Sequence, residues 1–158
     1  MRRSFRGFSY QVLCLFFLIL TCGCRDKGPW ATSQISSQDP RFSSTQVVFR
    51  ADDPVHGLDV DFLKTFQGLY LYLSAHSPLK HAWVDVLIDG QKQRFQGHLQ
   101  KGNQRLLLPE EATTLILAAL SQESPIEIAT SGFHAKIPAG HFPLEKNRVR
   151  TILDFVPF

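Results

Sequence analysis

Cysteine is absent from everything after residue 24 of this 158-residue chain, and the three that occur are Cys14, Cys22 and Cys24. A small secreted domain held together by disulfides is therefore excluded for the rest of the chain, and so are thiolate metal ligands there. Nine prolines and ten glycines are too few for a collagen-like or low-complexity protein. The apolar and charged shares of 44% and 20% are those of one modest globular domain.

The chain also lacks a charge surplus outside its first residues. The formal charge of +3 comes entirely from Arg2, Arg3 and Arg6, since residues 25–158 contain 17 − 3 = 14 basic residues against 14 acidic ones. A domain without basic excess has no field to attract a nucleic-acid backbone. We therefore expect no nucleic-acid partner.

Long hydrophobic runs are absent too, because the apolar run over residues 12–20 (VLCLFFLIL) has only nine residues. Counted to Cys24, a helix of that length falls well short of a hydrocarbon core of roughly 30 Å. A basic segment precedes the run and Thr21-Cys22-Gly23-Cys24 follows it. This order is typical of an export signal with its processing site, although an uncleaved N-terminal anchor stays an alternative.

A cysteine that directly follows such an apolar run and a small residue resembles the lipobox of bacterial lipoproteins. The resemblance covers residues 1–24 and implies that the signal peptide, residues 1–23, is cut before Cys24. That cysteine would then carry a diacylglyceryl group on sulfur and an acyl chain on its amine. Several acyl chains together give stable membrane attachment. We favour Cys24 because small Gly23 precedes it, and Cys22, which follows Thr21, is the alternative; an ordinary cleaved signal is a third possibility.

Arg25 follows the favoured lipidation site. In Gram-negative lipoproteins retention at the inner membrane usually goes with Asp at that position, so the resemblance favours the outer membrane. Residues 24–45 are rich in Ser and Gln without periodicity, and we interpret them as the lipidated cysteine and a flexible polar tether. Residues 46–158 then form a single globular domain.

The patterns within 46–158 predict a mainly β, α+β fold, a small antiparallel sheet or sandwich with one packed helix near 109–121. Residues 58–74 fit either a helix or, as we favour, a helical turn over 59–66 followed by a strand over 69–75. Alternation and turn signals predict a meander of three antiparallel strands over 82–88, 93–99 and 104–108. Further strands are predicted over 46–49, 126–130, 133–137 and 149–155. Asp89-Gly90 and Ser131-Gly132 are the expected turns.

No residue pattern carries a catalytic or metal site. The six histidines show no zinc-binding spacing, and turn formation and capping explain Asp52, Asp53, Asp59 and Asp61 better than calcium does. Ser77-Pro78-Leu79-Lys80 matches the Ser-x-x-Lys of penicillin-binding enzymes but falls in an expected loop rather than at a helix start. We expect no catalytic residue, metal or cofactor.

Four aromatic residues on expected strands, Tyr70, Tyr72, Trp83 and Phe95, fit either core packing or the lining of a ligand groove. The sequence thus predicts a lipid-anchored envelope protein with a non-catalytic interaction or structural domain. Its expected partners are membrane lipid, through acylated Cys24, and a protein or wall component of the envelope. The alternatives are a periplasmic domain that binds a small molecule or a peptide through an open sheet edge, and a small envelope hydrolase.

Overall fold

Residues 29–140 are described by a computed structural model, in which two antiparallel sheets and one α-helix form a mainly β, α+β fold, as the sequence predicted. The first sheet has the order β1 (Trp30–Ile35), β2 (Ser44–Phe49), β3 (Leu58–Thr65), β4 (Gly68–Ala75), β8 (Arg105–Leu107) and β7 (His98–Leu99). The second has the order β10 (Phe133–Ile137), β9 (Ile126–Thr130), β5 (Trp83–Ile88) and β6 (Gln91–Gln96). The helix is α2 (Glu110–Ser121), and a short 3-10 helix, η1 (Pro40–Phe42), joins β1 to β2.

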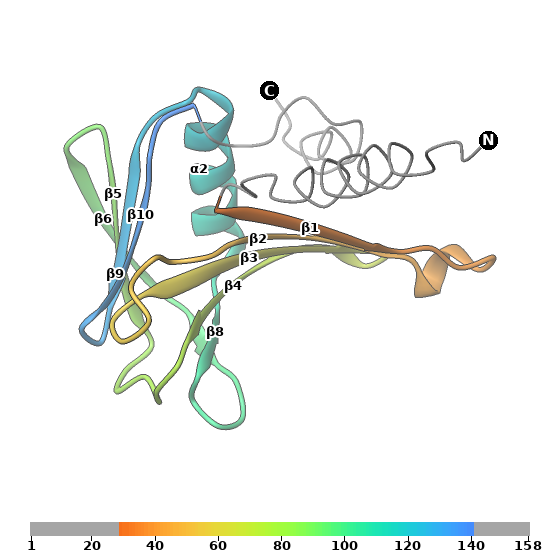
Figure 1. Cartoon of the computed structure of the whole chain (residues 1–158), viewed down its shortest axis with the longest axis horizontal. Helices are drawn as coiled ribbons and strands as arrows, with labels where there is room; N and C mark the ends of the chain where they lie inside the picture. Colours follow the sequence, from red (N-terminus) through yellow and green to blue (C-terminus); the bar gives the residue numbers. More distant parts are fainter. Residues whose placement is uncertain (1–28, 141–158) are drawn as a thin grey trace, which may run out of the picture.

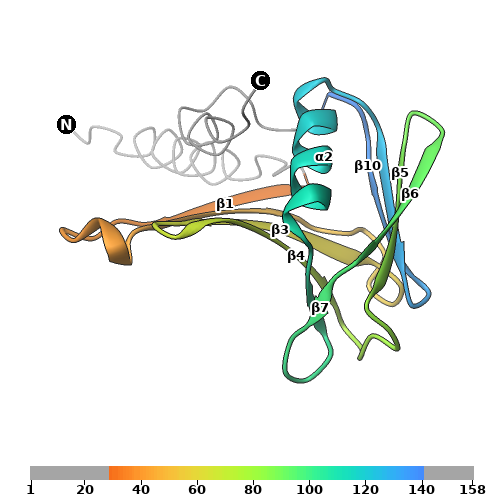
Figure 2. The same ribbon diagram turned by 180° about the vertical axis from the view of Figure 1, so that it is seen from behind.

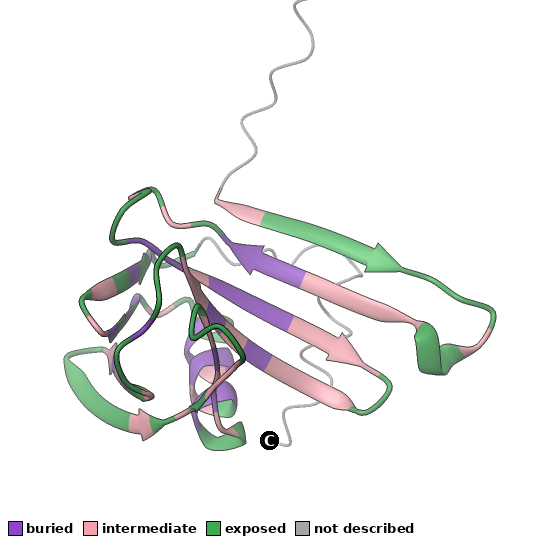
Figure 3. Ribbon diagram, turned by 90° about the horizontal axis from the view of Figure 1, so that it is seen from below, coloured by how far each residue is buried: buried purple, intermediate pink, exposed green. Residues whose placement is uncertain are grey.

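The two sheets stand at a steep angle to each other, and α2 lies in the corner between them (Figures 1 and 2). The core fills this corner, with buried side chains from both sheets and from the helix, among them Phe62, Leu73, Ile116 and Ile128. The hairpins β1–β2 and β3–β4 extend away from the corner (Figure 1). Their buried residues accordingly lie at the end next to the second sheet, and the far ends are more exposed (Figure 3).

The expected helical turn over 59–66 is wrong, because Leu58–Thr65 is the strand β3. Leu58, Val60 and Phe62 are fully buried, and this two-residue period fits a strand with one face on the core. The β3–β4 turn requires Gly68, whose φ of 147° is costly for other residues. The strand expected over 69–75 is confirmed as β4.

The predicted three-strand meander is also wrong. Its first two strands form the hairpin β5–β6 with the expected Asp89-Gly90 turn, at φ 48° and 79°. The chain then leaves the second sheet at Gly97, where an added Cβ would lie 2.7 Å from the Leu107 carbonyl oxygen. The third strand, β8, therefore pairs with β4 and β7 in the first sheet.

The tether predicted over 24–45 is wrong for residues 30–45, because β1 pairs with β2 along its whole length. Trp30 secures this edge strand from one end, with its ring 5.2 Å from that of Phe49 in an edge-to-face arrangement. The other residues of β1 are exposed, so the strand has no apolar alternation to reveal it. Residues 24–28 lie outside the described part of the chain.

The predicted helix is confirmed as α2, which follows Pro109 and carries Glu110 and Glu111 at its positive end. The 126–137 hairpin is confirmed as β9 and β10, with Ser131 and Gly132 in its turn at φ 52° and 88°. The strand predicted over 149–155 lies outside the described residues. Within 29–140, no helix has the length and apolar character needed to cross a membrane.

Candidate functional site

Within residues 29–140, one side of β6 is an open sheet edge, since β6 is the last strand of the second sheet. The two-residue turn after Ile88 makes Ile88 and Gln91 the closing pair of the hairpin, and such a pair exchanges both backbone hydrogen bonds. Alternation along the strand then directs the backbone N–H and C=O groups of Lys92, Arg94 and Gln96 away from β5. These groups are available to a further strand.

A shallow groove of about 900 Å³ runs between β6 and the first turns of α2. Its apolar residues are half-buried and come from both elements: Phe95 from β6, and Leu115 and Ala118 from α2. Pro109, Glu110 and Glu111 line the same groove where the helix begins. One face of the helix therefore packs on the core, while the neighbouring face with Leu115 and Ala118 is partly exposed to solvent.

The charged residues of the groove differ from those on the outer face of the sheet in whether they form ion pairs. Among the described residues, Glu110 and Glu111 take part in no ion pair. By contrast, Asp85 accepts two hydrogen bonds from the Arg94 guanidinium, at 2.7 and 3.1 Å, and its Oδ2 lies 2.8 Å from Lys92 Nζ. The hydrogen bonds from Arg94, and then those from Lys92, hold the pKa of Asp85 well below its usual range. The same pairing raises the pKa of Arg94. Asp85 thus keeps both cations on the outer face of the sheet.

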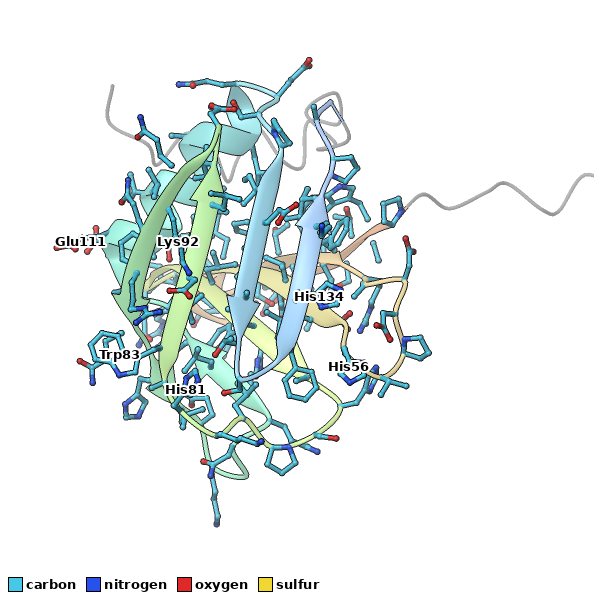
Figure 4. All side chains as sticks on the ribbon, turned by 90° about the vertical axis from the view of Figure 1, so that its left-hand side faces the viewer. His56, His81, Trp83, Lys92, Glu111 and His134 are labelled. Carbon is cyan, nitrogen blue, oxygen red and sulfur yellow. The ribbon has the colours of Figure 1, made fainter. Side chains whose placement is uncertain are left out.

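Trp83 is an exposed large apolar residue close to this edge, with 47% of its surface accessible. It is paired across the hairpin with Gln96, the last residue of β6. Figure 4 shows Trp83 and Glu111 on the β6 side of the second sheet, whereas His134 lies on the β10 side. The open edge is therefore bordered by an indole on the outer face and by the groove on the inner face.

The outer face of the second sheet also has a shallow depression of about 450 Å³ around Ala129, which is paired with Asp85 on one side and His134 on the other. His81 lies at its rim, where Ser131 Oγ accepts hydrogen bonds from the backbone N–H groups of Lys80 and His81. Asp85 and Arg94, which line the depression, form an ion pair with each other.

The aromatic residues that could have formed one ligand groove do not meet. The rings of Tyr70 and Tyr72 are tilted by 34° with their centroids 6.5 Å apart on the outer face of the first sheet, where the Arg105 guanidinium lies 3.8 Å above the Tyr72 ring. Trp83 is paired with Gln96, the residue next to Phe95. Because successive residues of a strand point to opposite faces, Trp83 and Phe95 lie on opposite faces of the second sheet. The aromatic residues thus contribute to three separate surfaces.

Three of the four acidic residues considered for calcium, Asp53, Asp59 and Asp61, have partners within the protein. Asp53 accepts backbone hydrogen bonds from His56 and Val55, and these bonds lower its pKa. Asp59 binds Arg50 and the Ala51 N–H group, and Asp61 binds Gln46 and Arg105. Over residues 29–140, no three His, Cys, Asp or Glu side chains gather closely enough to hold a metal ion.

The Ser-x-x-Lys motif, Ser77 to Lys80, lies in the loop between β4 and β5, as predicted. Among the described histidines, His56 has the single contact with a carboxylate below 4 Å, with its Nδ1 3.7 Å from Asp53 Oδ2, and both side chains are exposed. The lipidation candidates Cys24 and Cys22 lie outside the described residues, as does Arg25. Comparisons with protein-family models, with curated proteins and with solved structures find no match.

The groove beside β6 was not identified as a site from the sequence, although an open sheet edge was one of the alternatives considered. Two signals were present. Leu115 and Ala118 extend the apolar face of α2 beyond the stripe that the core needs, and QKQRFQ is a polar strand after a tight turn, as an edge strand often is.

Proposed function

We propose that this protein is an exported bacterial lipoprotein, anchored through acylated Cys24, whose domain acts as a non-catalytic interaction module at the cell envelope. Cys22 is the alternative anchor. Arg25 next to the anchor favours attachment to the outer membrane, with the domain facing the periplasm. Neither a cofactor nor a nucleic acid takes part in this proposal.

The anchor rests on the sequence of residues 1–24, where a basic segment, a nine-residue apolar run and Gly23-Cys24 follow in order. The interaction role rests on one structural observation, the open edge of β6 beside a partly apolar groove. A sheet edge readily pairs with another chain, and charged residues such as Lys92 and Arg94 limit unspecific pairing. An edge accompanied by a groove is instead a common means of binding a polypeptide.

A periplasmic small-molecule binder is the second candidate, and the 450 Å³ depression around Ala129 favours it. That volume falls within the range of about 300–1,000 Å³ that is usual for ligand sites. However, the depression is shallow, and Asp85 and Arg94 on its border already neutralise each other. The third alternative, a small hydrolase, gains no support from His56 and Asp53, whose 3.7 Å separation exceeds a hydrogen bond.

The anchor is tested by radiolabelled palmitate incorporation in a bacterial host that expresses the full chain. We expect label on the wild type and on Cys22→Ala but not on Cys24→Ala. Cys24→Ala should also leave the detergent-rich phase in a phase-separation assay. Label lost only with Cys22→Ala moves the anchor to Cys22. A wild type that takes up no palmitate contradicts the lipoprotein proposal.

A further inference from the structure

We infer that the β6 edge binds an extended segment of another protein, which joins the second sheet as a fifth strand and places alternate side chains in the groove beside α2. This inference deepens the proposed interaction function by naming the surface and the chemistry of its partner. The expected segment has apolar residues at alternate positions and a cation near Glu110 and Glu111.

The backbone of β6 provides the first argument. Lys92, Arg94 and Gln96 each direct an N–H and a C=O away from β5, so three residues offer a complete hydrogen-bonding ladder to an incoming strand. The opposite edge of the sheet is less open, because the His134 N–H on β10 donates to the His56 carbonyl at 2.9 Å. The edge of β1 is open as well within the described residues, but β1 contributes neither to the groove beside α2 nor to the depression around Ala129.

The groove provides the second argument. A strand that pairs with β6 turns every second side chain toward the inner face of the sheet. On this side those side chains meet Phe95, Leu115 and Ala118, which are half-buried and apolar. Their burial favours valine, leucine or a similar residue at these positions of the partner. Trp83, half-exposed beside the end of the edge, offers a contact to the residues on the other face.

The charges provide the third argument, and they disfavour a second copy of this chain as the partner. Glu110 and Glu111 are exposed and lack a cationic partner within the described part, so a lysine or arginine of the incoming strand would meet two free carboxylates. A second copy of this chain offers no such residue on its inward positions, which are Gln91, Gln93 and Phe95. Antiparallel pairing of two β6 strands centred on Arg94 would also place the two Arg94 residues opposite each other, which is unfavourable.

The experiment measures the fluorescence anisotropy of labelled decapeptides with the full-length protein purified in detergent. The first peptide alternates valine with threonine and carries lysine at both ends. The second replaces the lysines with glutamate, and the third is the lysine peptide with every second amide N-methylated. We expect saturable binding of the lysine peptide and an affinity about tenfold lower for each of the other two peptides. The N-methylated peptide binds more weakly because it has lost the N–H donors on one side of its strand.

Variants locate the binding. Gln96→Pro removes one outward N–H, whereas Gln96→Ala removes the same side chain and keeps that N–H, so we expect about tenfold weaker binding for the first alone. Ala118→Trp should also weaken binding by filling the groove, whereas Ala129→Phe, on the outer face of the same sheet, should not. Circular dichroism shows which variants are folded, and Ala118→Trp tests the groove independently of the edge substitution.

Several results overturn the inference: no binding of the lysine peptide, equal binding of the N-methylated peptide, or equal loss with Gln96→Ala and Gln96→Pro. A dimer in sedimentation experiments that Gln96→Pro dissociates would show that a second copy occupies the edge. The anchor is judged separately, since Cys24→Ala should bind the lysine peptide as the wild type does. Peptide binding without palmitate on the wild type would refute the anchor alone, and palmitate without peptide binding would refute the strand addition alone.

Discussion

Asp61 and Arg105 form an ion pair on the outer face of the first sheet, and its disruption is a quantitative test of the fold. The Asp61 side chain is only 8% exposed, whereas that of Arg105 is 40% exposed. Asp61 Oδ2 accepts hydrogen bonds from Arg105 and Gln46, but its Oδ1 and the Arg105 Nε are buried without a hydrogen-bond partner. The pair is thus buried at its carboxylate and incompletely satisfied.

We predict that Asp61→Leu lowers the free energy of unfolding by about 3 kcal/mol. Two hydrogen bonds to a charged group contribute about 1.5–3 kcal/mol each, and the lower value applies because Arg105 retains access to water. The double variant Asp61→Leu/Arg105→Leu should lose only about 1 kcal/mol, because it leaves no unpaired charge and removes both unsatisfied atoms. The expected coupling energy is therefore about 2 kcal/mol or more.

Urea unfolding of the four proteins in this cycle, followed by tryptophan fluorescence, measures these differences. Arg105→Leu completes the cycle, and Arg50→Leu is a control, since Arg50 pairs with Asp59 at a more exposed site. A double variant as unstable as the sum of the two single ones would show that Asp61 and Arg105 act independently. That result would refute our reasoning about the pair.

Three further predictions test the fold around the proposed site. Gly97→Ala should lower the free energy of unfolding, measured in urea, by roughly 2 kcal/mol or more, since the new Cβ would lie 2.7 Å from the Leu107 carbonyl oxygen. An unchanged midpoint of urea unfolding would contradict the close crossing of the two sheets. Because Asp85 has a lowered pKa in the folded state, its pairing stabilises the protein above the unfolded pKa near 4 and is lost as the pH falls toward the folded value. The wild type should thus lose more stability than Asp85→Asn between pH 5 and pH 2, and parallel pH profiles would argue against the pairing. Trp30→Ala should lower the free energy of unfolding by about 1–3 kcal/mol, because its ring packs on Phe49. Ile35→Ala, at a residue 64% exposed, should lower it by less than about 0.5 kcal/mol. Equal and negligible effects of the two substitutions would show that β1 is a flexible tether after all.

The sequence predicted the elements whose signals are local. Asp89-Gly90 and Ser131-Gly132 specify their turns through positive φ, and Pro109 with two following glutamates marks the start of α2. These signals act within a few residues, so no knowledge of the rest of the fold is required. The fold class followed from the same elements.

The errors concern features that depend on distant residues. β1 is polar and exposed, and its pairing with β2 defines it as a strand. The exit of the chain at Gly97 depends on a contact with Leu106 and Leu107, nine and ten residues further on. The groove requires β6 and α2 to lie side by side, although β7 and β8 in the other sheet separate them in sequence. Its individual residues were therefore not predictable from local patterns, whereas an open edge of some kind was.

The correction at β1 changes what the proposed anchor can do. The predicted tether over residues 25–45 could have held the domain up to about 70 Å from the membrane, at about 3.3–3.6 Å per extended residue. Because β1 begins at Trp30, only residues 25–29 separate Cys24 from the first strand, and they span at most about 18 Å. A domain acylated at Cys24 would then work close to the lipid surface. With the anchor at Cys24, the partner strand proposed for β6 would come from a protein that is itself at the membrane or reaches to within a domain's width of it.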